Sequence, residues 1–315
     1  MPTRILVTGA TGKQGGAVIR ALRSQPNAPT LRALTRNLDS PRARELRQQG
    51  IEVVKGSFSD IESIKRALTG VSAAFLGKSS GLYVSMVASK NDLPEEQQGY
   101  NFIEAAKATN LPFLVFTSVS DATTTCGVHH FETKARIEIA LRESGIPHAI
   151  IAPSALYDNF TRRHSWANFG ALGVFETGLQ GGKVQMTAAD DVGARIFQGE
   201  FAPIDLADPS LRVQIGEIAA QMLLNSGTYA GRRIDLAGDY LSMSEVQRAY
   251  SAVEGKPVRK AAVPAMALKL LPQDAQQMFR WFRTDGFTVD LDALRKEFPR
   301  LRSFEQWLRE GEVAA

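Results

Sequence analysis

Short apolar runs alternate with amphipathic stretches along the first half of the chain. Six such runs have the length of a strand buried on both faces, at residues 5–7, 31–35, 51–55, 71–76, 114–117 and 148–152. The stretches between them place apolar residues at helical spacing or carry helix start and stop residues, at 18–22, 40–49, 61–68, 95–109 and 132–143. Strands that alternate with helices predict a parallel sheet with right-handed crossovers and helices on both faces, which is an α/β fold of the doubly wound Rossmann type.

The alternation stops after Pro153. Residues 156–182 are rich in glycine, asparagine and aromatic residues, which predicts an insertion at the mouth of the sheet. Asp190 and Asp191 are placed to cap a helix over 192–197, and a strand near 233–236 returns the chain to the core. Helices from 244 onward, including 264–271, 273–282 and 304–309, are expected to form a lid. We therefore expect a Rossmann core from 1–153 and about 184–238, and a smaller, discontinuous, α-rich region from about 154–183 and 239–315 that covers the substrate.

Three glycines follow the first strand with the spacing G-x-x-G-x-x-G. Gly9 allows a sharp turn, Gly12 allows the backbone to approach a pyrophosphate, and Gly15 allows the next helix to lie close to the strand. The N-terminus of that helix offers unpaired N–H groups and the positive end of its dipole to phosphate. Strand, glycine turn and helix in this order predict a dinucleotide-binding site, and the alternative is a tight turn without a ligand.

The end of the second strand indicates which nicotinamide cofactor is bound. NAD-specific folds usually place Asp or Glu there to hold the ribose 2′-hydroxyl. This chain has Thr35, Arg36 and Asn37 instead. A guanidinium favours a 2′-phosphate through its charge and its bidentate hydrogen bonds, so we predict NADP(H). The alternative is that Arg36 is a solvated charge at the end of a strand.

Composition narrows the function classes. The 315 residues carry a net charge of only +4 without a block of like charge, so direct nucleic-acid binding is not expected. Cys126 is the single cysteine, which excludes disulfides within the chain and favours a reducing compartment. The apolar stretches of the sequence are too short to span a membrane, and the chain starts directly in a strand rather than in a signal peptide. The Cys, His and carboxylate residues are not spaced as zinc ligands are. We therefore expect a cytoplasmic protein without a metal or a membrane partner.

Side chains that could carry chemistry follow the fifth strand. The small hydroxyl residues at 117–120 can serve a nicotinamide or cap the strand end. His130 and Lys134 are four residues apart and therefore share one helix face. The ammonium could fix ribose hydroxyls while the imidazole beside it carries a proton near neutral pH. The alternative is an exposed basic helix start.

Further candidates follow the fourth and sixth strands. The side chains of Tyr157 and Asn159 can bond a nicotinamide carboxamide or a substrate, and they can equally belong to a turn. Lys78, directly after Gly77, is a candidate for a phosphate or ribose contact. The aromatic residues expected to line an apolar substrate pocket are Tyr157, Trp166, Phe169 and Phe175.

These motifs together resemble the NmrA-like family of atypical short-chain dehydrogenases. They span nearly the whole chain in the expected order: I-L-V-T-G-A-T-G-K-Q-G-G, A-L-T-R-N, G-I-E-V-V-K-G, Q-G-Y-N-F-I-E-A-A-K, H-F-E-T-K, Y-D-N-F and D-L-D-A-L-R-K-E-F-P-R-L-R-S-F-E-Q-W-L. The resemblance implies a Rossmann core that holds NADP(H) through several separate segments. The contacts that it implies are Gly9, Ala10, Thr11, Gly12, Lys13, Gln14, Arg36, Asn37, Lys134, Leu156, Tyr157 and Asn159.

Some positions differ from the classical short-chain dehydrogenases, and others differ from the usual pattern of the NmrA-like family. His130 stands where classical short-chain dehydrogenases have the proton-donating tyrosine of Tyr-x-x-x-Lys, as is common in the family. Ser57 and Phe58 occupy the region expected near the adenine, and Gly77 and Lys78 end the fourth strand in place of a more usual Val-Thr-Asn. The expected cofactor contacts include Ser57, Phe58, Gly77 and Lys78.

The family contains both reductases and proteins that bind the cofactor without turning it over, as redox sensors that act on transcription factors or other partners. As an enzyme, this chain would reduce a carbonyl, quinone or imine-type small molecule in an apolar pocket, with Lys134 orienting the nicotinamide ribose and His130 or Tyr157 relaying a proton. As a sensor, it would bind a protein partner instead. The retention of His130 and Lys134 as a pair favours the enzyme, while the substrate, the reaction direction and the presence of a homo-oligomer stay open.

Overall fold

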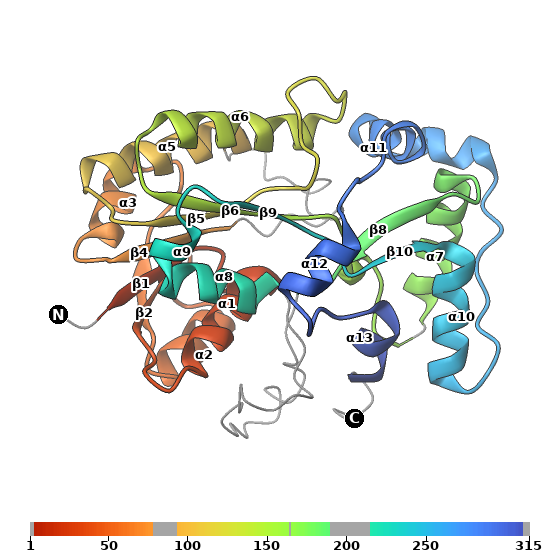
Figure 1. Ribbon diagram of the computed structural model, residues 1–315, viewed down its shortest axis with the longest axis horizontal. Coiled ribbons are helices and arrows are strands. Elements are labelled where there is room, and N and C mark those ends of the chain that lie inside the picture. Colours follow the sequence, from red (N-terminus) through yellow and green to blue (C-terminus); the bar gives the residue numbers. More distant parts are fainter. Residues whose placement is uncertain (1–2, 78–92, 164, 190–214, 311–315) are drawn as a thin grey trace.

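Figure 1 shows the computed structural model of the protein, which describes residues 3–77, 93–163, 165–189 and 215–310. Its centre is a seven-stranded sheet with the order β3-β2-β1-β4-β5-β6-β9, in which neighbouring strands are parallel. The strands are β1 (Arg4–Val7), β2 (Thr30–Thr35), β3 (Glu52–Lys55), β4 (Ala73–Leu76), β5 (Leu114–Thr117), β6 (His148–Pro153) and β9 (Arg233–Leu236). The predicted Rossmann-type fold is confirmed, and the strand ends lie within about two residues of the predicted ones.

Alternate side chains of the buried strands supply two apolar layers. In β1, Ile5 and Val7 pack into one layer and Leu6 into the other, because successive side chains point to opposite faces. The helices on the Ile5 face are α1 (Lys13–Arg23), α2 (Pro41–Gln48) and α8 (Ile215–Leu224), and those on the Leu6 face are α3 (Ile61–Leu68), α5 (Glu95–Ala108) and α6 (His129–Glu143) (Figure 1). The short helix α9 (Ser226–Tyr229) leads into β9. Burial of both faces explains why the strands carry continuous apolar runs.

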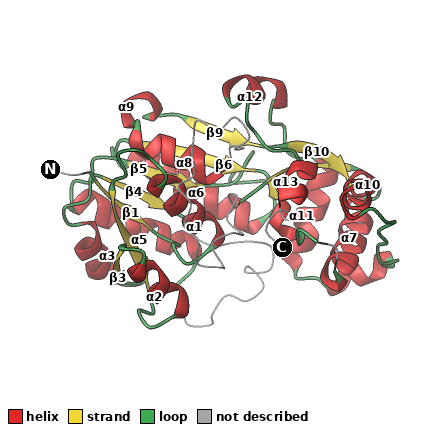
Figure 2. Ribbon diagram, turned by 90° about the horizontal axis from the view of Figure 1, so that it is seen from below, coloured by secondary structure: helices red, strands yellow, loops and turns green. Residues whose placement is uncertain are grey.

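A second region is built around a three-stranded sheet. Its order is β10-β8-β7, with β10 (Asp239–Ser242) antiparallel to β8 (Lys183–Thr187) and β7 (Ala155–Leu156) parallel to it. The helices are α7 (Trp166–Leu179), α10 (Met243–Glu254), α11 (Gln273–Thr284), α12 (Leu291–Glu297) and α13 (Phe304–Glu310), with 3-10 turns at η1 (Tyr157–Asn159) and η3 (Ala265–Leu270). The apolar faces of α7, α10, α11 and α13 pack into one cluster. Figures 1 and 2 both show these four helices gathered at the end of the molecule away from α2 and α3.

The glycine-rich insertion after Pro153 contains helix α7, whose glycines lie at packing positions. A Cβ atom at Gly173 would lie 2.5 Å from the carbonyl oxygen of Ala261, and one at Gly178 would lie 2.4 Å from the ring of Phe279. Such distances leave no room for a side chain, so glycine is what allows α11 and the segment before η3 to approach α7 closely.

The boundary between the two regions differs from the predicted one at β8. The sequence interpretation assigns residues 184–187 to the core, whereas Val184 and Met186 bury their side chains in the second cluster and β8 pairs with β7 and β10. The predicted helix over 192–197, with Asp190 and Asp191 as its caps, lies outside the described residues. Among the helices of the described ranges, none is long and apolar enough to cross a membrane.

Candidate active site

The glycine turn lies where the strand order of the large sheet reverses. Strands β2 and β3 lie on one side of β1, and β4, β5 and β6 lie on the other, which is the position where open parallel sheets bind ligands. Gly9 has a φ of 60°, and its carbonyl accepts a hydrogen bond from the N–H of Gly12 at 2.8 Å. A Cβ atom at Gly15 would lie 2.4 Å from the Gly9 oxygen, so α1 can begin this close to β1 only with glycine there. The first turn of α1 contains no acidic residue, which leaves its N-terminal end suited to an anion.

Neighbouring side chains hold the turn and connect it to the second region. Arg42 of α2 donates a hydrogen bond to the carbonyl of Thr11, and sequence reasoning missed this residue. Lys13 forms an ion pair with Asp158, with its Nζ 3.2 Å from Oδ1, which joins the start of α1 to η1. Thr117 of β5 donates to the side-chain oxygen of Gln14 at 3.5 Å. The N-terminal end of α1 is thereby fixed between three other elements, and Ala10 is buried beneath it.

The residues predicted to face the adenosine lie together at the edge of the sheet. Arg36 and Asn37 are exposed directly after β2, and the adjacent strand end is joined to it by a hydrogen bond from the N–H of Gly56 to the carbonyl of Thr35 at 2.9 Å. Ser57 and Phe58 follow Gly56, and the carbonyl of Phe58 accepts a hydrogen bond at 2.8 Å from Asn101. Arg36 and Ser57 therefore lie on the loops that follow the neighbouring strands β2 and β3, as binding of one ligand by both residues would require.

The end of β4 is joined to the end of β1. The N–H of Gly77 donates to the hydroxyl of Thr8 at 2.9 Å, and the same hydroxyl lies 3.0 Å from the carbonyl of Phe75. A Cβ atom at Gly77 would meet the Phe75 ring at 2.4 Å. Gly77 thus has a packing reason for being glycine, and Lys78, which follows it, lies outside the described residues.

A pocket opens between the carboxyl ends of β5 and β6 and the helices of the second region. It brings together residues that are far apart in the sequence and that the sequence analysis singled out, among them Gln14, His130, Lys134 and Asn159. The complete lining consists of Gln14, Glu95, Thr117, Ser118, Val119, His130, Phe131, Lys134, Pro153, Ser154, Ala155, Leu156, Asn159, Phe175, Met278, Phe282 and Phe287. Most of the polar groups come from the core and most of the apolar groups from the second region. A mainly apolar lining with a few polar groups is the usual composition of a small-molecule site.

Lys134 lies in this pocket paired with a carboxylate. Its Nζ is 2.9 Å from Oε1 of Glu95 and 3.4 Å from the carbonyl of Thr117, to which it donates, and the side chain is only 9% exposed. The same ammonium lies 5.3 Å from the ring centre of Phe116. Glu95 was missed by sequence reasoning, although an acidic residue in the first turn of a helix is a recognisable signal. The pair places a charged donor next to Gln14 and the cofactor turn.

His130 is paired with a carboxylate of the second region. Its Nδ1 contacts Oδ2 of Asp274, near the start of α11, and its ring packs edge-on against Phe131 with ring centres 4.5 Å apart. Burial by itself would raise the pKa of Asp274. The hydrogen bond and charge of His130, together with the backbone N–H groups of His129 and His130, outweigh this effect, so the pKa of Asp274 lies below its ordinary value. Sequence reasoning missed Asp274 because nothing in the pattern predicts which residue of α11 reaches α6.

Tyr157 points away from the pocket. Its hydroxyl donates to the carboxylate of Asp239 at 3.1 Å and lies 3.4 Å from the carbonyl of Arg302, and its side chain is completely buried. Burial, followed by the charge of Asp239, raises the pKa of this phenol well above its usual value. This placement contradicts the proton relay predicted for Tyr157, because the hydroxyl is held in the structural core of the second region instead.

Of the remaining aromatic residues predicted for the pocket, only Phe175 is part of its lining. Trp166, at the start of α7, is 86% exposed and packs edge-on against Phe169, with ring centres 5.4 Å apart. Phe131, Phe282 and Phe287 line the pocket in their place. Of the aromatic residues predicted for the wall, Phe175 lines the pocket, whereas Tyr157, Trp166 and Phe169 do not.

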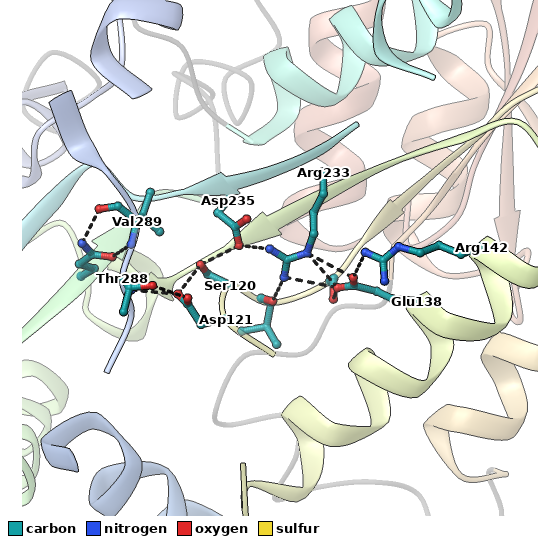
Figure 3. Close-up of polar contacts among 11 residues, drawn as sticks. Ser120, Asp121, Glu138, Arg142, Arg233, Asp235, Thr288 and Val289 are labelled. Atoms are coloured by element: carbon teal, nitrogen blue, oxygen red, sulfur yellow. Dashed lines mark hydrogen bonds and ion pairs between the residues drawn. The ribbon is translucent and has the colours of Figure 1, made fainter. Parts of the chain in front are cut away.

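A polar network, whose contacts Figure 3 shows, adjoins the pocket at Ser118 and Val119. The hydroxyl of Ser118, after β5, is hydrogen-bonded to the carboxylate of Glu138 in α6. Arg233 of β9 lies 3.2 Å from the same carboxylate and donates to the carbonyl of Val119 at 3.0 Å. Glu138 is only 3% exposed, and Arg142 also contacts it at 2.7 Å. The network holds α6, which carries His130 and Lys134, against β5 and β9.

The same network continues to the segment that contributes Phe287 to the lining of the pocket. Ser120 bonds Asp235 and Asp121, each at 2.9 Å. Asp121 in turn accepts hydrogen bonds from the N–H and the hydroxyl of Thr288, at 2.9 and 2.6 Å (Figure 3). Since Thr288 follows the pocket residue Phe287, these bonds attach the apolar wall to the end of β5.

Arg233→Met is expected to lower the free energy of unfolding by about 2 kcal/mol, because it removes one of two cations from a buried carboxylate while Arg142 remains. Arg232→Met is the matched control. Arg232 pairs with Glu297 at 2.7 Å where both side chains are about 40% exposed, so its loss should cost less than about 1 kcal/mol. Urea unfolding of both variants measures the difference, and equal losses would show that the buried network does not stabilise the fold.

Taken together, the sheet order, the glycine turn at the reversal point and the pocket beside it define a Rossmann-type protein with a dinucleotide-type site. The NmrA-like family model matches residues 1–307, and the chain therefore belongs to the NmrA-like family. The resemblance inferred from the sequence motifs is confirmed.

Relatives with names and structures are similar over most of the chain. The NmrA-like family domain-containing oxidoreductase FrzB of Cladobotryum sp is 28% identical over 298 residues, which cover 90% of this chain and 84% of that protein. The structure of the NADPH-dependent quinone oxidoreductase QOR2 of Escherichia coli in complex with NADPH has a TM-score of 0.70 at 21% identity, covering 99% of this chain and 100% of that one. The structure of NmrA, a negative transcriptional regulator, in complex with NADP has a TM-score of 0.62 at 18% identity, covering 98% and 95%.

Proposed function

We propose that this chain is an NADP(H)-dependent oxidoreductase that reduces a carbonyl, quinone or imine-type small molecule. The observation that carries the proposal is the pocket in which Lys134 and His130 lie beside Gln14 and face an apolar wall. An uncharged, conjugated acceptor fits that wall, and the two cation-forming side chains are placed to serve the polar end of such a molecule. The family membership and the oxidoreductase FrzB support the same reaction class.

The cofactor would be held by the glycine turn and by Arg36. Two observations support the fit: glycine at position 15 lets the start of α1 lie directly against the backbone of the glycine turn, and the first turn of α1 carries no competing carboxylate. The backbone N–H groups of Thr11, Lys13 and Gln14 would bind the pyrophosphate, since that of Gly12 donates to the Gly9 carbonyl. Arg36 would bind the 2′-phosphate. The similar structures of QOR2 and NmrA are complexes with NADPH and NADP, respectively.

When bound, NADPH supplies a hydride to the substrate. Lys134 would orient the nicotinamide ribose with its ammonium, whose position Glu95 and Thr117 hold from the other side. His130 would give a proton to the substrate oxygen or nitrogen. Phe131, Phe282 and the neighbouring apolar groups would keep water away from the reacting atoms.

Turnover of NADPH with quinones, aldehydes and imines, followed through the loss of reduced cofactor, tests this proposal. Steady oxidation with at least one acceptor class supports it. Tight NADPH binding without oxidation by any acceptor would contradict it and favour the second candidate, a sensor that binds the cofactor and signals to a protein partner. The similarity to NmrA, a negative transcriptional regulator, is the observation that favours that candidate.

Arg36→Ala is expected to weaken NADPH binding about 10- to 100-fold and to change NADH binding less than about twofold, because charged hydrogen bonds to the 2′-phosphate are worth roughly 1.5–3 kcal/mol. Arg44→Ala, which removes the same charge from the exposed face of α2, is the control and should leave both affinities unchanged. Titration calorimetry with the two nucleotides measures the ratio. Equal losses for both would remove the reason for assigning the 2′-phosphate to Arg36.

A further inference from the structure

The pairing of His130 with Asp274 joins the helix that carries the pocket cations to a helix of the second region. His130 lies in the first turn of α6 and Asp274 in the first turn of α11, 144 residues further along the chain. The contact is made by Nδ1 of the imidazole, and both side chains are about one quarter exposed. Since His130 also lines the pocket, Nε2 is the ring nitrogen left for a bound molecule.

Among the residues that the structure describes, the other charged groups near His130 have partners of their own. Lys134, one turn along α6, is engaged by Glu95 of α5, and both lie in the same pocket. Glu132, which neighbours His130 along the chain, is paired with Arg136 and accepts from the N–H of Gly127. The carboxylate that acts on the imidazole directly is therefore that of Asp274.

We propose that Asp274 is a positioning residue for His130. Its carboxylate accepts a hydrogen bond from Nδ1–H of His130, fixes the orientation of the ring and directs Nε2 to the substrate. This inference rests on the proposed oxidoreductase function. A carboxylate on one ring nitrogen stabilises the imidazolium and, in the neutral state, selects the tautomer with hydrogen on Nδ1.

The proton accounting follows from this arrangement. With NADPH bound, the substrate C=O carbon would accept a hydride, the C=O double bond would become a single bond, and its oxygen would take the proton from Nε2–H of the imidazolium. His130 would be left neutral with hydrogen on Nδ1, still bonded to Asp274, and would regain its second proton from water. NADPH would supply the two electrons and be released as NADP⁺.

Nitrogen NMR of the histidines in the protein without added nucleotide tests the tautomer. The chain has four histidines, and the loss of a signal in His130→Gln identifies that of His130. We expect neutral wild-type His130 to carry hydrogen on Nδ1. In Asp274→Asn we expect the amide oxygen to keep the backbone N–H groups of His129 and His130, which directs the NH2 group at Nδ1. The hydrogen should then move to Nε2, and Asp274→Glu should restore the wild-type pattern. The same tautomer in wild type and Asp274→Asn would overturn the proposal.

Steady-state kinetics supply the second readout. In Asp274→Asn, kcat should fall at least about tenfold while KM for NADPH changes less than about twofold, because proton transfer is impaired and the cofactor turn is untouched. Asp285→Asn, at the exposed other end of α11, should leave both unchanged. An unchanged kcat in Asp274→Asn would overturn the positioning role. Absence of turnover in the wild type would instead refute the proposed function, and the tautomer comparison would still decide the role of Asp274.

Discussion

Lys134→Met is expected to lower kcat for NADPH oxidation about 100-fold or more. Methionine keeps the length and much of the volume of the side chain but removes the ammonium that contacts Glu95 and the Thr117 carbonyl. The change removes the ammonium that pairs with Glu95, and with it the donor proposed to hold the nicotinamide ribose. Orientation of the cofactor and stabilisation of developing charge are both lost, and losses of this size are typical of positioned acid–base groups.

Lys107→Met provides the matched control for this experiment. Lys107 is exposed near the end of α5, so the same substitution there should leave turnover unchanged. Rates are compared at saturating NADPH, with the affinity for NADPH measured separately so that weaker binding is not mistaken for slower chemistry. If Lys134→Met turned over as fast as the wild type, the assignment of Lys134 to the reaction would be wrong, whatever the substrate.

Gly15→Val is expected to weaken NADPH binding at least about 100-fold. The added side chain would enter the space of the Gly9 and Thr8 carbonyl oxygens, which lie 2.4 and 2.6 Å from the position of the Cβ atom. These are backbone atoms of the turn itself, so the turn must move and the first N–H groups of α1 move with it. Loss of two charged hydrogen bonds to phosphate would weaken binding at least about 100-fold, and crowding would lower the free energy of unfolding by about 3 kcal/mol.

Gly16→Ala, one residue further, distinguishes this effect from a general sensitivity of the helix. A Cβ atom at Gly16 would lie 3.4 Å from the Arg20 side chain and 3.5 Å from the Ala10 carbonyl, which is ordinary contact. Alanine is also the better helix residue, so we expect a gain of about 0.5 kcal/mol and unchanged NADPH affinity. Comparable binding losses in both variants would mean that the close approach at Gly15 does not position the phosphate site.

The fold could be predicted from the sequence because its signals are local. Strands buried on both faces, such as β5, carry uninterrupted apolar residues, and the glycine turn has a spacing that few other structures require. His130 and Lys134 were found because residues four apart share a helix face, and that relation depends only on helix geometry. The helix after Pro153 was not predicted, because the glycines that allow close packing of α7 give this segment the composition of a loop.

The residues that the sequence did not reveal act across long separations. Glu95 and Asp274 meet their partners only through the packing of α5 and α11 on α6, and neither belongs to a motif. Tyr157 shows the opposite error, because a phenol after a strand end predicts a pocket residue while the chain turns it toward Asp239. Side-chain direction in the turn η1 depends on tertiary contacts that no local pattern encodes.

Titration calorimetry of the purified protein with NADPH and with NADH tests most directly whether the start of α1 and Arg36 form the cofactor site. Saturable heat from NADPH, with an affinity at least about tenfold higher than for NADH, is the predicted result. The absence of saturable heat from either nucleotide would contradict the account from the glycine turn onward.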